Sequence, residues 1–265
     1  MDTLGAILGP LTAFALLSVF TKSLTWDQGK SLRIIFLLSL IPGILAILIL
    51  ISLVTEVKRE KEGQASISLS LSLKGLSKEF KLLLFIMFLF SLGNSSDTFL
   101  ILRSSNLKFP QAQIPLLYTL FNVFYALLST PLGALSDKIG RPRTIMTGFI
   151  IYSLVYLGFG LLRPEQAHLL WLLFPLYGIY YAFTEGVLRA FVADISKKET
   201  RGFAYGVYHT LVGLTLLPAS LLAGFLWDKI SPSAPFYFGS IMAFLAFIFF
   251  AIFFGGQNEK KNSLG

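Results

Sequence analysis

The chain has 265 residues, of which 55% are hydrophobic and only 14% are charged. Soluble globular domains carry about 25% charged residues, so this composition excludes an ordinary soluble domain and indicates a chain embedded in a lipid bilayer. Cysteine is absent and there are two histidines, which excludes disulfides and leaves too few ligands for a histidine-rich metal site. The formal charge of +8 is expected on loops at one membrane face rather than on a nucleic-acid-binding surface. No metal or cofactor is expected.

Apolar segments of about 20 residues, long enough to cross a hydrocarbon core roughly 30 Å thick, recur along the chain. They do not alternate between apolar and polar residues as the strands of a membrane β-barrel would, so we expect helices. The predicted fold class is an all-α polytopic membrane protein. Its eight transmembrane helices are expected at about 3–21, 33–55, 80–102, 112–133, 144–162, 168–191, 203–226 and 235–254.

The helix ends on one side of the predicted membrane carry roughly twice as many Lys and Arg residues as those on the other side. Because basic loops stay in the cytoplasm, both termini are predicted to be cytoplasmic, with the protein in the plasma (inner) membrane. The longest connection, 56–79, falls on the basic side and is predicted to be a cytoplasmic linker. It separates a two-helix segment at 1–55 from a six-helix unit at 80–256, and a cytoplasmic tail follows at 257–265.

The connection between the fourth and fifth spans reads Gly-Ala-Leu-Ser-Asp-Lys-Ile-Gly-Arg-Pro-Arg at residues 133–143. It resembles the loop that follows helices 2 and 8 in the twelve-helix transporters of the major facilitator superfamily. The resemblance implies a cytoplasmic gating motif that locks the outward-facing state. The residues concerned are Gly133, Asp137, Lys138, Gly140, Arg141 and Arg143. The two glycines are expected to permit close packing and a tight turn. A generic basic turn that sets the topology is the alternative.

The opening segment, with Gly5, Gly9 and Pro10, resembles the glycine-proline motif of helix 5 in antiporters of the same family. Ordinary small-residue helix packing is the alternative. With this match the eight spans resemble helices 5 to 12, so 1–55 is expected to be the remnant of a truncated N-terminal half and 80–256 a complete C-terminal half. Met1 is then expected to be an internal start, or the start of a truncated reading frame or a partial sequence.

Polar residues inside the spans are the candidates for a site, because a charged side chain at mid-bilayer costs about 2.5–3.5 kcal/mol on insertion scales. In the third span, Asn94, Asp97 and Thr98 are spaced i, i+3 and i+4 and are expected to share one helical face. Two interpretations are open: a substrate or proton site, or an interfacial carboxylate hydrated from the outer surface. The fourth and sixth spans each carry a polar stripe at helical spacing. The stripes consist of Tyr118, Asn122 and Tyr125, and of Tyr177, Tyr181 and Glu185. They are predicted to line a shared aqueous cavity, with hydrogen-bonded helix packing as the alternative.

Glu185 and Arg189 are spaced four residues apart, which favours an ion pair on one helix. Two interpretations stay open at this point. The pair is permanent, or Arg189 exchanges between Glu185 and Asp137 as an inner gate moves.

The resemblance implies a secondary transporter that moves a small solute by alternating access. Proton-coupled efflux and antiport are both open, because Asp97 and Glu185 are titratable, and the expected partners are a small-molecule substrate, protons and membrane lipids. No Walker loop supports ATP-driven transport. A non-transporting scaffold or a decayed transporter remnant is the second hypothesis. A membrane-embedded lipid enzyme is the third, although no clustered His, Asp or Ser supports an enzyme.

Overall fold

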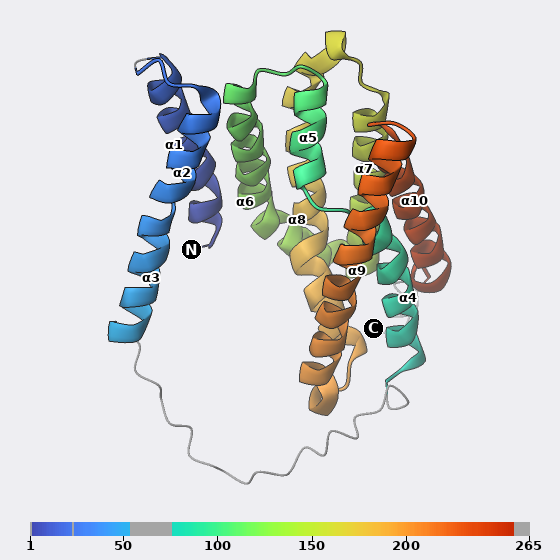
Figure 1. The fold of residues 1–265 in the computed structure, drawn as a ribbon. Helices are drawn as coiled ribbons and strands as arrows, with labels where there is room; N and C mark the ends of the chain where they lie inside the picture. Colours follow the sequence, from blue (N-terminus) through green and yellow to red (C-terminus); the bar gives the residue numbers. More distant parts are fainter. Residues whose placement is uncertain (1, 23, 54–75, 257–265) are drawn as a thin grey trace.

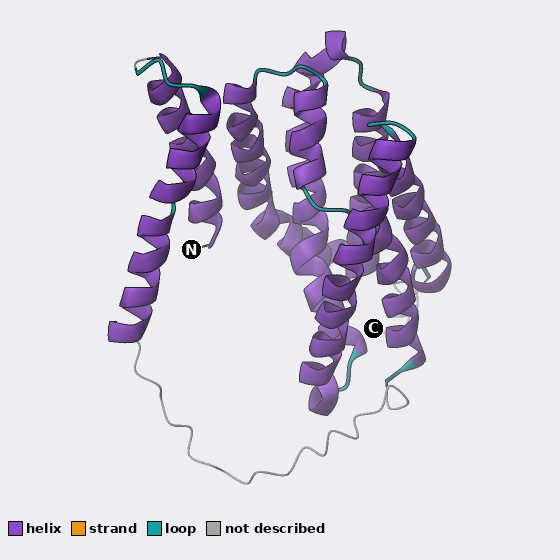
Figure 2. Ribbon diagram, in the orientation of Figure 1, coloured by secondary structure: helices purple, strands orange, loops and turns teal. Residues whose placement is uncertain are grey.

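The computed structural model describes residues 2–22, 24–53 and 76–256, and within these ranges the chain is helical and contains no strand (Figure 2). The helices are α1 (Asp2–Lys22), α2 (Gln28–Leu38), α3 (Leu40–Leu53), α4 (Lys78–Gly93), α5 (Thr98–Asn106), α6 (Ile114–Ile139), α7 (Arg141–Leu161), α8 (Leu170–Ile195), α9 (Arg201–Lys229) and α10 (Ala234–Phe254). Short 3-10 turns at Gln111–Gln113, Pro164–Leu169 and Lys198–Thr200 precede α6, α8 and α9.

The described chain contains seven segments that are long and apolar enough to cross a membrane, and α1 contributes the shorter apolar stretch Gly5–Thr21. The prediction of an all-α polytopic membrane protein with about eight spans is therefore confirmed. Two of the predicted spans are each built from two consecutive helices, α2 with α3 and α4 with α5.

The helices from α4 to α10 form a bundle in which α8 packs against both α6 and α7, and α10 packs against α7 and α4 (Figure 1). Helix α9 lies against α4, and α1 lies against α6 on the other side. Helix α3 lies at the edge, and the segment Gly29–Ile49 buries none of its most apolar stretch, as expected for a helix surrounded by lipid. The predicted linker at 56–79 lies mostly, and the tail at 257–265 entirely, outside the described residues, so the predicted division into two halves stays a prediction.

Several helix ends follow local sequence signals. The Ser77 side chain accepts a hydrogen bond from the backbone N–H of Phe80 (3.1 Å) at the start of α4, and Asp27 accepts one from Gly29 (2.9 Å) at the start of α2. Such side-chain caps satisfy N–H groups that have no partner within the helix. At Gly140 the backbone has φ 94°, a conformation that glycine adopts easily, and it separates α6 from α7 within a single residue. The predicted tight turn at this glycine is confirmed.

The contact between α6 and α8 depends on Gly178. A Cβ atom at this position would lie 2.4 Å from the carbonyl oxygen of Phe121 and 3.1 Å from the backbone nitrogen of Tyr125. Small residues allow membrane helices to approach this closely, and the approach brings the polar faces of α6 and α8 together.

We expect Gly178→Ala to lower the stability of the purified protein, because the added methyl group would push α8 away from the α6 backbone. Overpacking of this kind costs about 1–3 kcal/mol. Gly186→Ala is the matched control, since it lies on the same helix and its added Cβ would meet no atom within 4 Å. The measurement is the thermal unfolding midpoint in detergent, and equal midpoints for the two variants would contradict the close contact.

Candidate functional site

The third predicted span is broken in the middle. Helix α4 ends at Gly93 with Asn94 as its C-cap, and α5 begins at Thr98 with Asp97 as its N-cap residue. The prediction that Asn94 and Asp97 share one helical face is therefore wrong. The four residues from Asn94 to Asp97 are short and polar, and such side chains compete with helical hydrogen bonding by bonding to nearby backbone.

The break brings Asp97 to the interface between α6 and α8. Its two carboxylate oxygens accept hydrogen bonds from different helices: Oδ1 from the Tyr177 hydroxyl on α8 (2.7 Å) and Oδ2 from the Tyr118 hydroxyl on α6 (3.3 Å). Tyr177 is fully buried, whereas Asp97 and Tyr118 are partly buried and face an open space. The carboxylate is thus held in place by two neutral donors.

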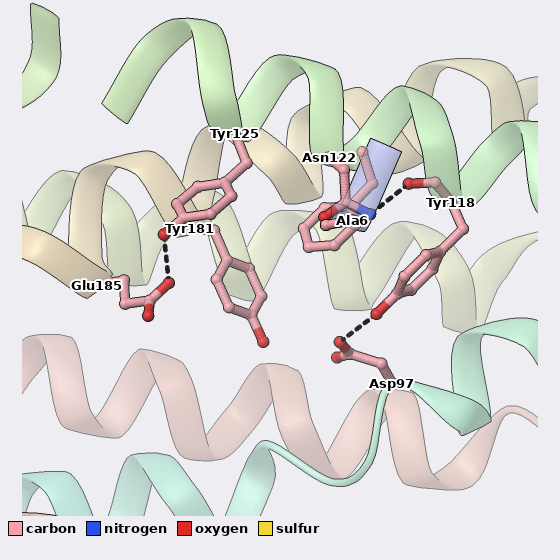
Figure 3. A pocket seen from close by; sticks show the side chains of 8 residues that line it. Ala6, Asp97, Tyr118, Asn122, Tyr125, Tyr181 and Glu185 are labelled. Carbon is pink, nitrogen blue, oxygen red and sulfur yellow. Dashed lines mark hydrogen bonds between the residues drawn. The ribbon is translucent and has the colours of Figure 1, made fainter. Parts of the chain in front are cut away.

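A cavity of about 220 Å³ lies beside this carboxylate (Figure 3). It is lined by Ala6, Asp97, Tyr118, Phe121, Asn122, Tyr125, Tyr181 and Glu185. These residues come from α1, the 94–97 break, α6 and α8, so the two predicted polar stripes face one space. Six of the eight residues predicted for the substrate or proton pathway line it. Their role in binding stays a prediction.

The other two predicted pathway residues lie outside the cavity lining. Tyr177 is behind the wall, where its hydroxyl contacts Asp97. Asn94 is near α7, and its side-chain oxygen accepts a hydrogen bond from the Tyr152 hydroxyl (3.3 Å).

The end of the cavity opposite Asp97 is formed by Glu185. Its Oε2 accepts a hydrogen bond from the Tyr125 hydroxyl (2.6 Å), and its Oε1 forms an ion pair with Arg189. The backbone carbonyl of Arg189 in turn accepts a hydrogen bond from the Tyr205 hydroxyl of α9 (2.7 Å). Glu185 is therefore balanced by a cation, and it connects the cavity to the contact between α8 and α9.

The predicted gating motif is mostly helical rather than a loop, because α6 continues to Ile139. Arg141 begins α7 and joins three helix ends: it forms ion pairs with Asp137 (3.5 Å) and with Asp194, and it donates a hydrogen bond to the Ala190 carbonyl (2.6 Å). Close packing at Gly133 was predicted and is wrong, since a Cβ there would meet no atom within 4 Å.

The predicted contact between Asp137 and Arg189 is not among the ion pairs of the described residues. Asp137 pairs with Arg141, and Arg189 pairs with Glu185. The permanent Glu185–Arg189 pair, one of the two interpretations left open by the sequence, matches this geometry. Exchange of Arg189 to Asp137 during gating, and the gating roles of Lys138 and Arg143, stay predictions.

The predicted packing motif of the first span is not seen in the described part of α1. A Cβ at Gly5 or Gly9 would meet no atom within 4 Å, and Pro10 lies within the helix and is partly buried. The residue of this segment that lines the cavity is Ala6.

Arg103 is a residue whose role the sequence analysis did not identify. In the charge comparison of the helix ends it falls on the side with fewer Lys and Arg residues, but its side chain is only 5% exposed. Its guanidinium donates hydrogen bonds to the carbonyls of Phe159 (3.0 Å), Gly160 (3.3 Å) and Leu162 (2.8 Å) at the end of α7. These carbonyls belong to the last turn of a helix, which has no intrahelical donor for them. Arg103 therefore attaches α5, the half-helix that follows Asp97, to α7. The signal available in the sequence was an arginine at the end of an apolar span.

These observations define an integral, multi-pass, all-helical membrane protein whose polar residues gather in a cavity between helices, as in proteins that move solutes across membranes. The sequence profile of the Major Facilitator Superfamily matches residues 83–264, and the chain belongs to this family.

The relatives agree with this assignment. An uncharacterized MFS-type transporter of Methanocaldococcus jannaschii is 39% identical over 251 residues, which cover 92% of this chain and 60% of that protein. A second uncharacterized MFS-type transporter from the same organism is 26% identical over 51% of this chain and 35% of its own length. The class B tetracycline resistance protein of Escherichia coli is 31% identical over 56% of this chain and 34% of its own length. This chain thus spans part of the length of each relative. None of them is named as an enzyme, and no solved structure matches the chain closely enough to be counted as a relative.

We expect Arg103→Met to lower the thermal unfolding midpoint by roughly 5–10 °C, because each buried carbonyl left without a donor costs about 1–3 kcal/mol. Arg33→Met, which removes an exposed arginine on α2, should leave the midpoint nearly unchanged. The two purified variants would be compared with the wild type in the same detergent. If both substitutions had the same small effect, Arg103 would not be the attachment between α5 and α7.

Proposed function

We propose that this chain contributes the solute-binding cavity of a secondary transporter that moves a small solute by alternating access. The observation that carries the proposal is the 220 Å³ cavity between α1, α6 and α8, with a carboxylate at each end. Membership of a family of transporters supports it, as do the printed names of the relatives. The aromatic and polar lining suits a small ligand that is both stacked and hydrogen-bonded.

Within this function, Asp97 is the residue proposed to carry the coupling proton. Ionised groups within membrane spans are costly and therefore tend to mark functional sites. Of the two carboxylates in the cavity, Glu185 has a cationic partner in Arg189, whereas no salt bridge to Asp97 occurs among the described residues. Asp97 can gain or lose a proton without leaving a neighbouring cation unpaired. Proton-coupled efflux and antiport both use such a group.

Arg141 is proposed to stabilise the closed state of the inner end of the bundle. It contacts the end of α6 through Asp137 and the end of α8 through Asp194 and Ala190. Separation of these helix ends would break its contacts together, which is the behaviour of a two-state element. The inner end is proposed to face the cytoplasm, with the protein in the plasma membrane, because basic residues gather there.

Asp97→Asn should abolish solute-driven proton movement. The asparagine keeps the size and polarity of the side chain but cannot exchange a proton. The measurement is the collapse of a preformed pH gradient, reported by a pH-sensitive dye, in inverted membrane vesicles that contain the full chain. A panel of small solutes that includes tetracycline and amines would be added in turn.

Asp228→Asn is the matched control, because Asp228 lies on α9 away from the cavity lining. A wild-type signal from Asp97→Asn would exclude Asp97 as the proton carrier. The absence of a signal for every solute with the wild-type chain would contradict transport itself.

A further inference from the structure

The cavity lining has more acidic than basic side chains, and this imbalance limits which solutes the cavity can bind. The lining residues include two carboxylates and no Lys, Arg or His. Glu185 is neutralised by Arg189, which reaches it from one helical turn away. In the described part of the chain, the Asp97 side chain accepts hydrogen bonds only from phenol hydroxyls, which are neutral donors. When Asp97 is ionised, the cavity therefore contains one net negative charge, and an anionic solute would be repelled.

Four of the six other lining residues are aromatic. Phe121, Tyr125 and Tyr181 line the cavity between its two carboxylates. The ring of Tyr181 lies 5.2 Å from that of Phe121 and 5.8 Å from that of Tyr125, measured between centroids, and both pairs are close to perpendicular. Perpendicular packing turns the face of one ring toward the edge of the next and presents ring faces in more than one direction. The negative face of an aromatic ring attracts a cation placed within about 6 Å of its centre.

We propose that the cavity binds a small organic monocation, a protonated amine or a quaternary ammonium, with its charged nitrogen at Asp97 and its apolar groups against Phe121 and Tyr181. This inference rests on the proposed function and names the substrate class of the same site. A single unpaired carboxylate matches a single positive charge, and the aromatic wall matches the alkyl groups around the nitrogen.

In this geometry the organic cation and a proton would compete for the same group, the Asp97 carboxylate. Either can neutralise Asp97, and the two cannot do so together without leaving a net positive charge in a membrane span. Among the described residues, the titratable groups that interact with Asp97 are Tyr118 from α6, Tyr156 from α7, and Tyr177, Tyr180 and Tyr181 from α8. All five are phenols, which are neutral near pH 7. Exchange of one cation for one proton at Asp97 would therefore keep the charge of the cavity constant.

Choline and 3,3-dimethylbutan-1-ol provide a matched pair of probes, since they have the same shape and differ by the charge at one atom. Binding to the full chain in lipid nanodiscs would be measured by isothermal titration calorimetry. We expect choline to bind the wild type at least about tenfold more tightly than the neutral alcohol. Choline binding should also strengthen as the pH rises, because a proton and choline compete for the Asp97 carboxylate.

Amino-acid substitutions can distinguish the contribution of the Asp97 charge to binding from that of the aromatic side chains. Asp97→Asn should weaken choline binding about tenfold or more and remove its pH dependence, whereas Asp228→Asn should change neither. Tyr181→Phe should retain binding because it keeps the ring, and Tyr181→Leu should lose it. Circular dichroism and gel filtration would identify any variant that fails to fold. The pH dependence and the neutral probe test the wild type alone, so they apply even if a variant does not fold.

Three results would overturn the inference. These are equal binding of choline and the alcohol, wild-type binding of choline by Asp97→Asn, and displacement of choline by millimolar NaCl but not by an equal concentration of tetramethylammonium chloride. Failure of this inference is distinguishable from failure of the proposed function. Proton movement driven by an uncharged solute would support the proposed transport function and contradict an organic cation as the substrate. Choline binding without any solute-driven proton movement would support the cation site and contradict the proposed transport function.

Discussion

The hydrogen bonds from Tyr118 and Tyr177 to Asp97 join three elements that are far apart in the sequence: the 94–97 break, α6 and α8. The cavity exists because these elements meet at one carboxylate. A charged side chain at this depth is costly in a membrane, and two phenol hydroxyls lower that cost without adding a charge of their own. The arrangement of the site thus provides hydrogen-bond donors for one partly buried carboxylate.

The broken span imposes a second requirement, because backbone groups in lipid must find partners within the protein. The carbonyl of Gly93, at the end of α4, accepts a hydrogen bond from the Tyr152 hydroxyl (3.0 Å). The backbone N–H of Ser96 donates to the Ser220 side chain of α9 (3.4 Å). Arg103 then attaches α5 to the end of α7. Irregular backbone at this depth is therefore held between α7 and α9, and the cost of breaking the helix is offset by contacts that also fix the position of Asp97.

The sequence predicted best what depends on regular helices. The spacing of Tyr118, Asn122 and Tyr125 put them on one face because α6 continues without a break, and the same holds for Tyr181 and Glu185 on α8. The sequence predicted poorly the features that depend on a break within a helix or on which helix lies alongside. The apolar residues on either side of 94–97 concealed the break, although a run of Asn, Ser, Ser and Asp is a turn signal.

The errors at Arg103 and Gly133 have a different cause. A charge near a helix end suggests contact with water, and a glycine in a familiar motif suggests close packing, but both properties depend on which helix lies alongside. Arg103 has the end of α7 beside it, whereas the space around Gly133 is open. Single-helix periodicity contains no information about either neighbour. The same limit applies to Gly178, whose importance comes from the backbone of α6.

The two carboxylates of the cavity are of the same chemical type, but their neighbours differ in charge. The charge of Glu185 is balanced by its ion pair with Arg189. Glu185 is thus better suited to hold α8 in register with Tyr125 and, through Arg189, with Tyr205 on α9. Within the described ranges, the hydrogen-bonding partners of the Asp97 carboxylate are both neutral phenols. A phenol can donate to a carboxylate or to the carbonyl oxygen of a carboxylic acid, and the contacts from Tyr118 and Tyr177 therefore tolerate both states. The carboxylate with neutral hydrogen-bonding partners lies at the helix break, and the carboxylate paired with a cation lies where α8 meets α9.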